Sequence, residues 1–270
     1  MLAGVIGWPV SHSRSPRLHG YWLRHYGITG HYVPLAVRPQ DFGAAVAMLP
    51  RLGFVGANVT LPHKEAAFAV CDDVEPLAQR IGAVNTLIFQ DGRVVGRNTD
   101  GYGFLANLRA GAPTWQPTAG PVVLLGAGGG ARAAAVALLD AGVPSVTLVN
   151  RTRARAEAVV DALGGGLAAA DWSDLPALLA DATLLVNTTS LGMTGQPPLE
   201  IDLTGLSPKA LVTDIVYAPL ETQLLASARA RGNPTVDGLG MLLHQAVPGF
   251  TAWFGIAPEV TPALRAAVLG

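Results

Sequence analysis

The chain has a single cysteine, Cys71, among its 270 residues. One thiol excludes an internal disulfide and any cysteine-cluster metal site, and no other pattern in the sequence indicates a bound metal. Proteins of reducing compartments do without disulfides, so we expect a cytoplasmic location. Cys71 follows an alanine-rich helical stretch, where the role of a small buried apolar residue is expected.

Long apolar runs and an excess of charge are missing too. No segment approaches the roughly 18 uninterrupted apolar residues that cross a bilayer, and the N-terminal residues lack the basic lead and the length of a signal peptide. The formal net charge is -1, which leaves no broad basic surface for nucleic acid. We therefore expect a small-molecule substrate, no nucleic acid and no membrane, with a homodimer left open.

Lysine is rare, because Lys64 and Lys209 are the only lysines among the 18 basic residues. Where this chain uses lysine it departs from its preference for arginine. Lys64 is therefore a position to examine for chemistry.

Apolar runs alternate with helical patterns along the whole chain, which is typical of parallel sheets covered by helices. In the first half we expect strands near 2–7, 31–36 and 54–59, helices near 15–26, 40–52, 63–80 and 100–108, and a hairpin of 83–89 and 93–97 that closes the sheet. In the second half we expect strands near 122–126, 145–149, 167–170, 183–187, 211–215 and 234–236, then helices at 238–254 and 258–269. The predicted domains are 1–101, 102–237 and a tail, 238–270, that returns to the first domain.

A glycine-rich turn follows the apolar run that begins at Val122. Gly126 permits the sharp turn, Gly128 lets the backbone approach a pyrophosphate, and Ala131 is the small residue where helix packs on strand. The helix N-terminus then faces the anion. The chain is rich in glycine, so the turn alone is a weak signal, but its strand-turn-helix-strand context favours a dinucleotide-binding Rossmann domain over a plain turn.

No acid stands at the end of the next strand, where binders of unphosphorylated NAD place Asp or Glu for the ribose hydroxyls. Asn150, Arg151 and Thr152 occupy that place, with Arg153 and Arg155 just beyond. Guanidinium groups suit a 2′-phosphate, so we expect NADP as the cofactor, the alternative being a solvated basic helix start.

Polar residues gather where strands of the first half end, and such ends meet at one edge of a parallel sheet. The segments are 11–16, 58–65, 85–86 and 98–101, which carry Ser, Asn, Thr, Lys and Asp. This set suits a small polyhydroxylated anion. Lys64 and Asp100 are the candidate pair for proton transfer, the alternative being a surface lysine and a helix-capping aspartate. For His12 and His63 we expect structural or hydrogen-bonding roles.

These motifs together resemble the shikimate dehydrogenases. The matching segments, in chain order, are Ser13-x-Ser15, Asn58 to Lys64, Gly82 to Thr86, Asn98 to Gly101, Gly126 to Ala131, Asn150 to Thr152 and Asp237 to Gln245. The resemblance implies an α/β protein with a mainly parallel α/β substrate domain and a doubly wound Rossmann NADP-binding domain. It also implies an oxidoreductase of the shikimate pathway of aromatic amino acid biosynthesis, which reduces 3-dehydroshikimate to shikimate reversibly with NADP.

The resemblance assigns roles to individual residues. It makes Lys64 and Asp100 the catalytic pair, without deciding which of them exchanges the proton. Its substrate-binding residues are Ser13, Ser15, Asn58, Thr60, Lys64, Asn85, Asp100, Tyr217 and Gln245. Its cofactor-binding residues are Gly126, Ala127, Gly128, Gly129, Gly130, Ala131, Asn150, Arg151, Thr152, Arg155, Thr188, Thr189, Ser190, Leu191, Met193, Ile215, Gly238 and Met241.

Three other interpretations stay open. A quinate/shikimate dehydrogenase of broader specificity keeps the lysine and aspartate but usually reads the ribose with an acid. A non-catalytic NADP-sensing module and an NADP-dependent reductase of a different small metabolite are the others. Rates with two cofactors and a panel of substrates discriminate among them.

Overall fold

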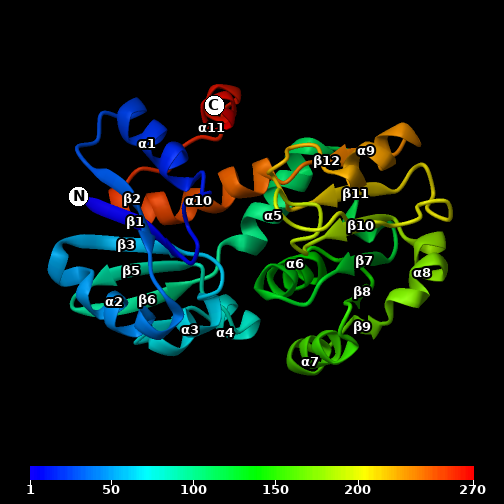
Figure 1. Ribbon diagram of the computed structural model, residues 1–270, viewed down its shortest axis with the longest axis horizontal. Helices are drawn as coiled ribbons and strands as arrows, with labels where there is room; N and C mark the ends of the chain where they lie inside the picture. The colour runs from blue at the N-terminus through cyan, green and yellow to red at the C-terminus, as the bar shows by residue number, and fades with distance from the viewer. The chain divides into compact units, whose positions relative to one another are not determined.

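The computed structural model describes residues 1–270 and divides the chain into two compact units. Unit 1 combines Met1–Asp100 with Leu242–Gly270, and unit 2 is Gly101–Met241. The domains predicted from the sequence are 1–101, 102–237 and 238–270. The segment that returns to unit 1 begins at Leu242 in the structure, four residues later than residue 238. Figure 1 colours the chain by residue number and labels its elements.

Unit 1 contains a six-stranded sheet of order β2-β1-β3-β5-β6-β4. Its strands are β1 (Leu2–Gly7), β2 (His31–Ala36), β3 (Phe54–Val59), β4 (Asp73–Val74), β5 (Thr86–Gln90) and β6 (Arg93–Arg97). Its helices are α1 (Ser15–His25), α2 (Phe42–Met48), α3 (Lys64–Val70), α4 (Pro76–Ile81), α10 (Leu239–Phe254, from Leu242 on) and α11 (Pro262–Leu269), with 3-10 turns at Pro39–Asp41 and Pro50–Leu52. β1, β2 and β3 run parallel, whereas β5 is antiparallel to both β3 and β6.

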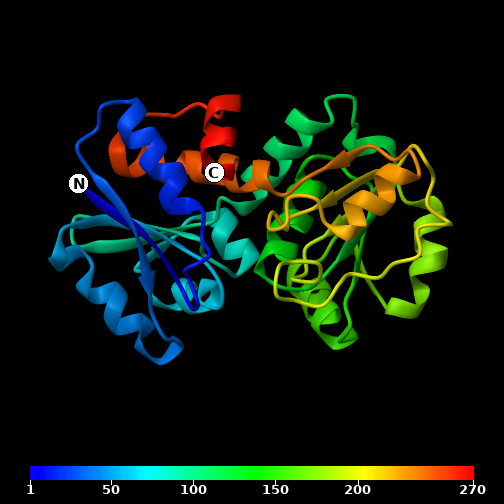
Figure 2. The same cartoon turned by 45° about the horizontal axis from the view of Figure 1, so that its top comes forward.

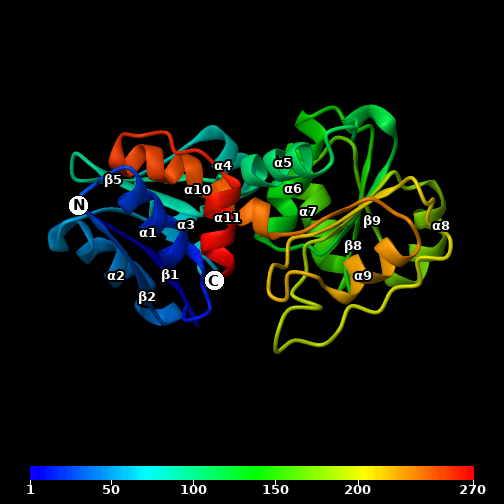
Figure 3. The ribbon, with the colours of Figure 1, turned by 90° about the horizontal axis from the view of Figure 1, so that it is seen from above.

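Helices cover both faces of this sheet. Apolar residues of α2 and α3 pack against Ile6, Ala57 and Val59 to form one core. On the other face α1 lies against β1, β2 and α11 (Figure 2), and Figure 3 shows α1, α10 and α11 over the same face. The indole Nε1 of Trp253, in α10, donates to the Leu87 carbonyl at 3.0 Å. The last helices are therefore part of the core of unit 1.

Two of the expected elements differ in the structure, and one turn forms as expected. The hairpin does not close the sheet, because the two-residue strand β4 pairs parallel with β6 at the edge and interrupts the helical stretch predicted for 63–80. The helix predicted at 40–52 is a 3-10 turn, α2 and a second 3-10 turn, since Pro50 cannot continue the α-helical hydrogen bonds. The hairpin turn at Asp91 and Gly92 does form, and both residues have positive φ, as this kind of turn requires.

Unit 2 contains a parallel six-stranded sheet of order β12-β11-β10-β7-β8-β9. The strands are β7 (Val122–Leu125), β8 (Val146–Val149), β9 (Leu167–Ala170), β10 (Leu184–Asn187), β11 (Leu211–Asp214) and β12 (Thr235–Val236). The helices are α5 (Asp100–Gly111, from Gly101 on), α6 (Gly129–Asp140), α7 (Arg153–Leu163), α8 (Leu175–Asp181) and α9 (Gln223–Ala230), with 3-10 turns at Pro117–Ala119 and Trp172–Asp174.

Alternate residues of the strands enter two separate cores. Val122 and Leu124 pack with α5, α6 and α7, whereas Val123 and Leu125 pack with α8 and α9. A sheet buried on both faces explains why these strands are continuously apolar. The predicted α/β fold with a doubly wound second domain is confirmed. None of the helices has the length and apolarity that spanning a membrane requires.

Candidate active site

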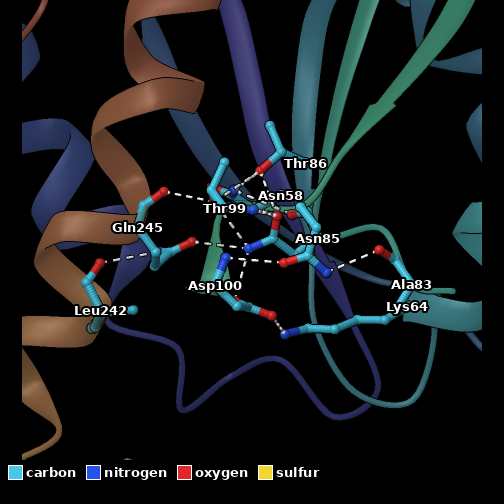
Figure 4. A network of polar contacts seen from close by, with 10 residues as sticks. Asn58, Lys64, Ala83, Asn85, Thr86, Thr99, Asp100, Leu242 and Gln245 are labelled. Atoms are coloured by element: carbon cyan, nitrogen blue, oxygen red, sulfur yellow. Dashed lines mark hydrogen bonds and ion pairs between the residues drawn. The ribbon is translucent and has the colours of Figure 1, made fainter. Parts of the chain in front are cut away.

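The centre of the polar site in unit 1 is the side chain of Asn85, which lies one residue before β5 and is buried. Its Nδ2 donates to Asp100 Oδ1 at 2.8 Å and to Thr99 Oγ1 at 3.0 Å, with a longer contact of 3.4 Å to Gln245 Oε1. Its Oδ1 accepts from the Thr99 backbone N at 2.9 Å. Figure 4 shows this side chain between β5, α10 and the segment that enters α5. Asn85 therefore holds three separate segments of unit 1 together.

Lys64 and Asp100 form an ion pair at this centre, because Lys64 Nζ contacts Asp100 Oδ2 (Figure 4). The side chain of Asp100 is 6% exposed and that of Lys64 18%. Lys64 is the first residue of α3, and its backbone carbonyl accepts from Val84 N at 2.9 Å. Asp100 N in turn donates to Asn98 Oδ1 at 3.1 Å. Both members are thus anchored through the backbone, with the lysine end open to a small molecule.

A second layer lies behind Asn58, and sequence reasoning missed it. Tyr32 Oη donates to Asn58 Oδ1 at 2.7 Å, and the ring of His19 stacks on Tyr32 with 3.9 Å between centroids. Burial raises the pKa of Tyr32 well above its usual range, although a hydrogen bond with Ser15 opposes this. Burial also lowers the pKa of His19 from 6.5 to about 3. Both side chains are neutral at physiological pH, so this layer orients Asn58 without adding charge.

The amide of Asn58 is fixed on its other side as well. Asn58 Nδ2 lies 3.2 Å from Thr86 Oγ1 and 3.3 Å from the Asn85 carbonyl oxygen. Because Thr86 Oγ1 donates to Asn85 Oδ1 at 2.9 Å, the contacts continue to the central amide. Tyr32, Asn58, Thr86 and Asn85 therefore form one connected series of polar groups.

The remaining predicted substrate residues come from four different segments of the chain. Ser15 is the first residue of α1 and its backbone N donates to Ser13 Oγ at 3.3 Å. Thr60 follows β3, and its methyl group lies where a side chain on Gly7 would go. Gln245 is in α10, and its carbonyl accepts from Thr99 Oγ1 at 2.8 Å. Tyr217 belongs to unit 2.

His63 has a structural environment. Its Nε2 lies 2.8 Å from the Val37 carbonyl, and its ring stacks on Phe42 with 4.7 Å between centroids. It is the N-cap residue of α3, so the helix begins at Lys64. His12 is exposed. No group of three or more His, Cys, Asp or Glu side chains is placed to hold a metal ion.

The glycine turn in unit 2 has the local geometry of a phosphate cradle. Gly126 has φ +114°, and a Cβ there would lie 2.6 Å from Thr188 Oγ1. Gly128 is the N-cap of α6, and a Cβ there would meet nothing within 4 Å, which leaves open space above the backbone. The helix runs on through Gly129, Gly130 and the buried Ala131, while Ala127 is half-buried. These features fit a pyrophosphate at the N-terminus of α6.

The arginines after β8 are in different environments. Arg153 is bound to two acids, with its Nε 2.8 Å from Glu157 and its Nη1 2.6 Å from Asp171. Arg151 and Arg155 are exposed and lie on either side of Thr152, whose carbonyl accepts from Asn150 Nδ2 at 2.9 Å. The side chains of Arg151 and Arg155 are therefore the ones that fit a 2′-phosphate.

The other predicted cofactor residues lie on loops beyond β10 and β11 and at the start of α10. Thr188 Oγ1 donates to the Leu125 carbonyl at 2.6 Å, which places the loop of Thr189, Ser190, Leu191 and Met193 beside the glycine turn. A Cβ on Gly238 would lie 2.4 Å from the Ile215 carbonyl, so only glycine fits there. A Cβ on Gly130 would lie 3.3 Å from the side chain of Ile215. Met241 packs into the unit 2 core.

Comparison with known proteins gives consistent matches over the whole chain. Family models match at residues 5–87 (shikimate dehydrogenase substrate binding domain), 116–193 (shikimate / quinate 5-dehydrogenase) and 238–269 (shikimate 5′-dehydrogenase C-terminal domain). A shikimate dehydrogenase (NADP(+)) of Rhodospirillum rubrum is 63% identical, with 100% of this chain and 97% of that protein covered.

Two solved structures extend the comparison. Shikimate 5-dehydrogenase from Thermus thermophilus, in complex with NADP(H) and shikimate, has a TM-score of 0.89 at 38% identity, over 100% of this chain and 98% of that one. Quinate dehydrogenase from Corynebacterium glutamicum, in complex with NAD, has a TM-score of 0.92 at 33% identity, over the same shares.

A dinucleotide-binding unit and a unit with a partly buried lysine–carboxylate pair define a class, the NADP-dependent oxidoreductases of two α/β units. Within that class, the matches extend over both units and their site motifs. The chain belongs to the shikimate dehydrogenase family.

Proposed function

We propose that this protein catalyses the reversible NADP-dependent reduction of 3-dehydroshikimate to shikimate, a step of aromatic amino acid biosynthesis. The observation that carries the proposal is the Lys64–Asp100 pair, held in a buried amide frame within a chain 63% identical to a shikimate dehydrogenase (NADP(+)). NADP supplies or accepts the hydride that is exchanged at the substrate C3. The protein must therefore handle the proton on the C3 oxygen.

We assign that proton to Lys64, and the contacts of Asp100 support the assignment. Asn85 Nδ2 and Lys64 Nζ both donate, one to each carboxylate oxygen. Both oxygens of the Asp100 carboxylate are thus engaged, which leaves Lys64 as the group of the pair that can exchange a proton with the substrate. In the reductive direction Lys64 gives a proton to the C3 oxygen, and in the oxidative direction it accepts one. Asp100 orients both the lysine and the substrate hydroxyl.

The substrate is held by the remaining polar groups of unit 1. We assign the carboxylate to the hydroxyls of Ser13 and Ser15, and the ring hydroxyls to Asn58, Thr60, Asn85, Asp100 and Gln245. Tyr217, on unit 2, is assigned as an additional substrate contact. The support for this set is the connected series of contacts from Tyr32 through Asn58 and Asn85 to Asp100.

NADP is assigned to unit 2. Its pyrophosphate is placed at Gly126 to Ala131, its 2′-phosphate at Asn150, Arg151, Thr152 and Arg155, and its nicotinamide end at residues 188–193, Ile215, Gly238 and Met241. The absence of an acid at 150–152 and the exposed Arg151 and Arg155 favour NADP over NAD. We further propose a cytoplasmic location, consistent with the free Cys71 thiol, and leave the homodimer as a hypothesis that sedimentation velocity tests.

Initial rates of the purified protein with each pairing of shikimate or quinate with NADP or NAD test the function. We expect shikimate with NADP to give the highest kcat/KM. Comparable rates with quinate and NAD would instead support the broader-specificity enzyme. No turnover with any pairing, in a protein that binds NADP, would support the NADP-sensing module.

A further inference from the structure

Two polar side chains that no role above uses face each other at the ends of neighbouring strands in unit 2. Asn187 is the last residue of β10 and Asp214 the last of β11, and they are register partners in the parallel ladder. Both are fully buried. Asn187 Nδ2 donates to Asp214 Oδ1 at 2.9 Å.

Each of these side chains also holds the loop that follows its strand. Asn187 Oδ1 accepts from the backbone N of Thr189 at 3.0 Å and from its Oγ1 at 2.8 Å, and Asn187 Nδ2 donates to the Leu191 carbonyl at 3.2 Å. Thr189 Oγ1 then accepts from Leu191 N at 3.1 Å. The first turn of the loop after β10 is therefore built on one amide.

Asp214 does the same for the loop after β11. Its Oδ1 accepts from the backbone N of Val216 at 2.9 Å, and its Oδ2 accepts from Thr222 Oγ1 at 2.8 Å. Thr222 is the N-cap of α9. Burial raises the pKa of Asp214, and the hydrogen bonds from Val216, Thr222 and Asn187 oppose that rise. A polar pair buried at this depth would be replaceable by apolar residues if stability were its only role.

We propose that Asn187 and Asp214 are positioning residues for the cofactor, which fix the loops 188–193 and 215–222 relative to each other. The inference rests on the proposed function, because these loops carry the residues assigned to the nicotinamide end of NADP. Neither side chain is assigned a direct contact with the cofactor. The pair holds Thr189, Leu191 and Ile215 in the positions that bind NADP. The loops are therefore ordered before NADP binds, and binding does not lose free energy in ordering them.

The test compares three variants of the full chain. Asn187→Ala removes all contacts of the amide, and Asn187→Ser is the milder second variant should the first not fold. Asp214→Asn is conservative, because an amide oxygen can keep the bonds from Asn187 and Val216 while the Thr222 hydroxyl turns to accept. Thr213→Val is the matched control, since Thr213 is equally buried, adjoins Asp214, and donates only to the Val236 carbonyl, at 2.9 Å.

The readouts are the Kd for NADP by titration calorimetry, KM for each substrate and the melting temperature. We expect Asn187→Ala to raise the Kd for NADP about tenfold or more, and to raise KM for shikimate at saturating NADP by less, since Tyr217 is the one assigned substrate residue on these loops. Thr213→Val should lower the melting temperature yet leave the Kd for NADP within about twofold, and Asp214→Asn should stay within about threefold.

Equal Kd values for Asn187→Ala and Thr213→Val would overturn the proposal, since the pair would then act on stability alone. A loss of affinity in Asp214→Asn as large as that in Asn187→Ala would also overturn it. Wild-type protein that fails to bind NADP would refute the proposed function itself, which separates the two failures.

Discussion

Replacing Lys64 by alanine is the most direct test of the catalytic assignment. The change removes the cation paired with Asp100 and the only proton donor assigned to the C3 oxygen. General acid–base catalysis contributes about 10²- to 10⁴-fold, so we expect kcat to fall at least about 10²-fold. Since each tenfold is about 1.36 kcal/mol, this corresponds to at least about 2.7 kcal/mol of lost transition-state stabilisation.

The structure also predicts which parameter stays unchanged. Asp100 keeps its position without Lys64, because Asn85 Nδ2 still donates to its Oδ1 at 2.8 Å and Asn98 still accepts from its backbone N. The hydroxyl contact from Asp100 to substrate therefore survives, and KM for shikimate should change less than about threefold. The loss should be in kcat.

Initial rates of NADPH formation from shikimate, at saturating NADP, measure both parameters. Lys209→Ala is the matched control, because Lys209 is exposed and is the only other lysine. We expect wild-type rates for that variant. A folded Lys64→Ala protein with kcat within about threefold of wild type would refute the assignment of the proton to Lys64.

Three further predictions concern the cofactor, the substrate and pH. Arg151→Ala should raise KM for NADP about tenfold and leave KM for NAD unchanged. Arg153→Ala should change neither, because two acids already bind Arg153. Equal effects of the two substitutions on KM for NADP would contradict the 2′-phosphate assignment. Tyr32→Phe leaves Asn58 Oδ1 without its donor and should raise KM for shikimate about fivefold or more. Tyr26→Phe is the control, because the Tyr26 hydroxyl accepts from the backbone N of Glu259, and it should not raise KM. An unchanged KM in both variants would show that the hydrogen bond from Tyr32 is not needed to position Asn58. The pKa of His19 is lowered from 6.5 to about 3 in the folded protein. Below pH 6.5 the unfolded chain binds a proton at this histidine and the folded protein does not, so the free energy of unfolding decreases as the pH falls below 6.5. Relative to His19→Phe, wild type should therefore lose about 3 kcal/mol of unfolding free energy between about pH 7.5 and about pH 4.5, and denaturant titrations that give parallel pH profiles would contradict this.

Much of the site was predictable because its residues lie where strands end. Asn58 is the residue before the last of β3, Lys64 begins the next helix, and Asp100 begins α5. The rule that parallel strands present their carboxyl ends at one edge of the sheet already groups them. The glycine turn was predictable for a related reason. Its glycines follow an apolar strand directly, and only backbone conformation and space matter there.

The missed features depend on contacts between segments far apart in sequence. Tyr32 reads as an ordinary strand residue and His19 as part of an amphipathic helix, and nothing in their spacing predicts that the two rings stack at 3.9 Å. The strand β4 has two residues, too few for an alternating pattern. Asn187 and Asp214 did leave a signal, since each is the polar last residue of a fully buried strand.

The place of the last helices in unit 1 has a consequence for how the protein is made. Phe250 and Trp253 are buried in the core of unit 1, and Trp22 Nε1 donates to the Glu259 carbonyl at 3.0 Å. A ribosome makes residues 1–100 first, but these residues must wait for the final segment before their core is complete. The nucleotide-binding unit is one continuous stretch and can fold as soon as it emerges. The unit that begins first during translation is therefore the one that finishes last, and Gln245 joins its site only at that final stage.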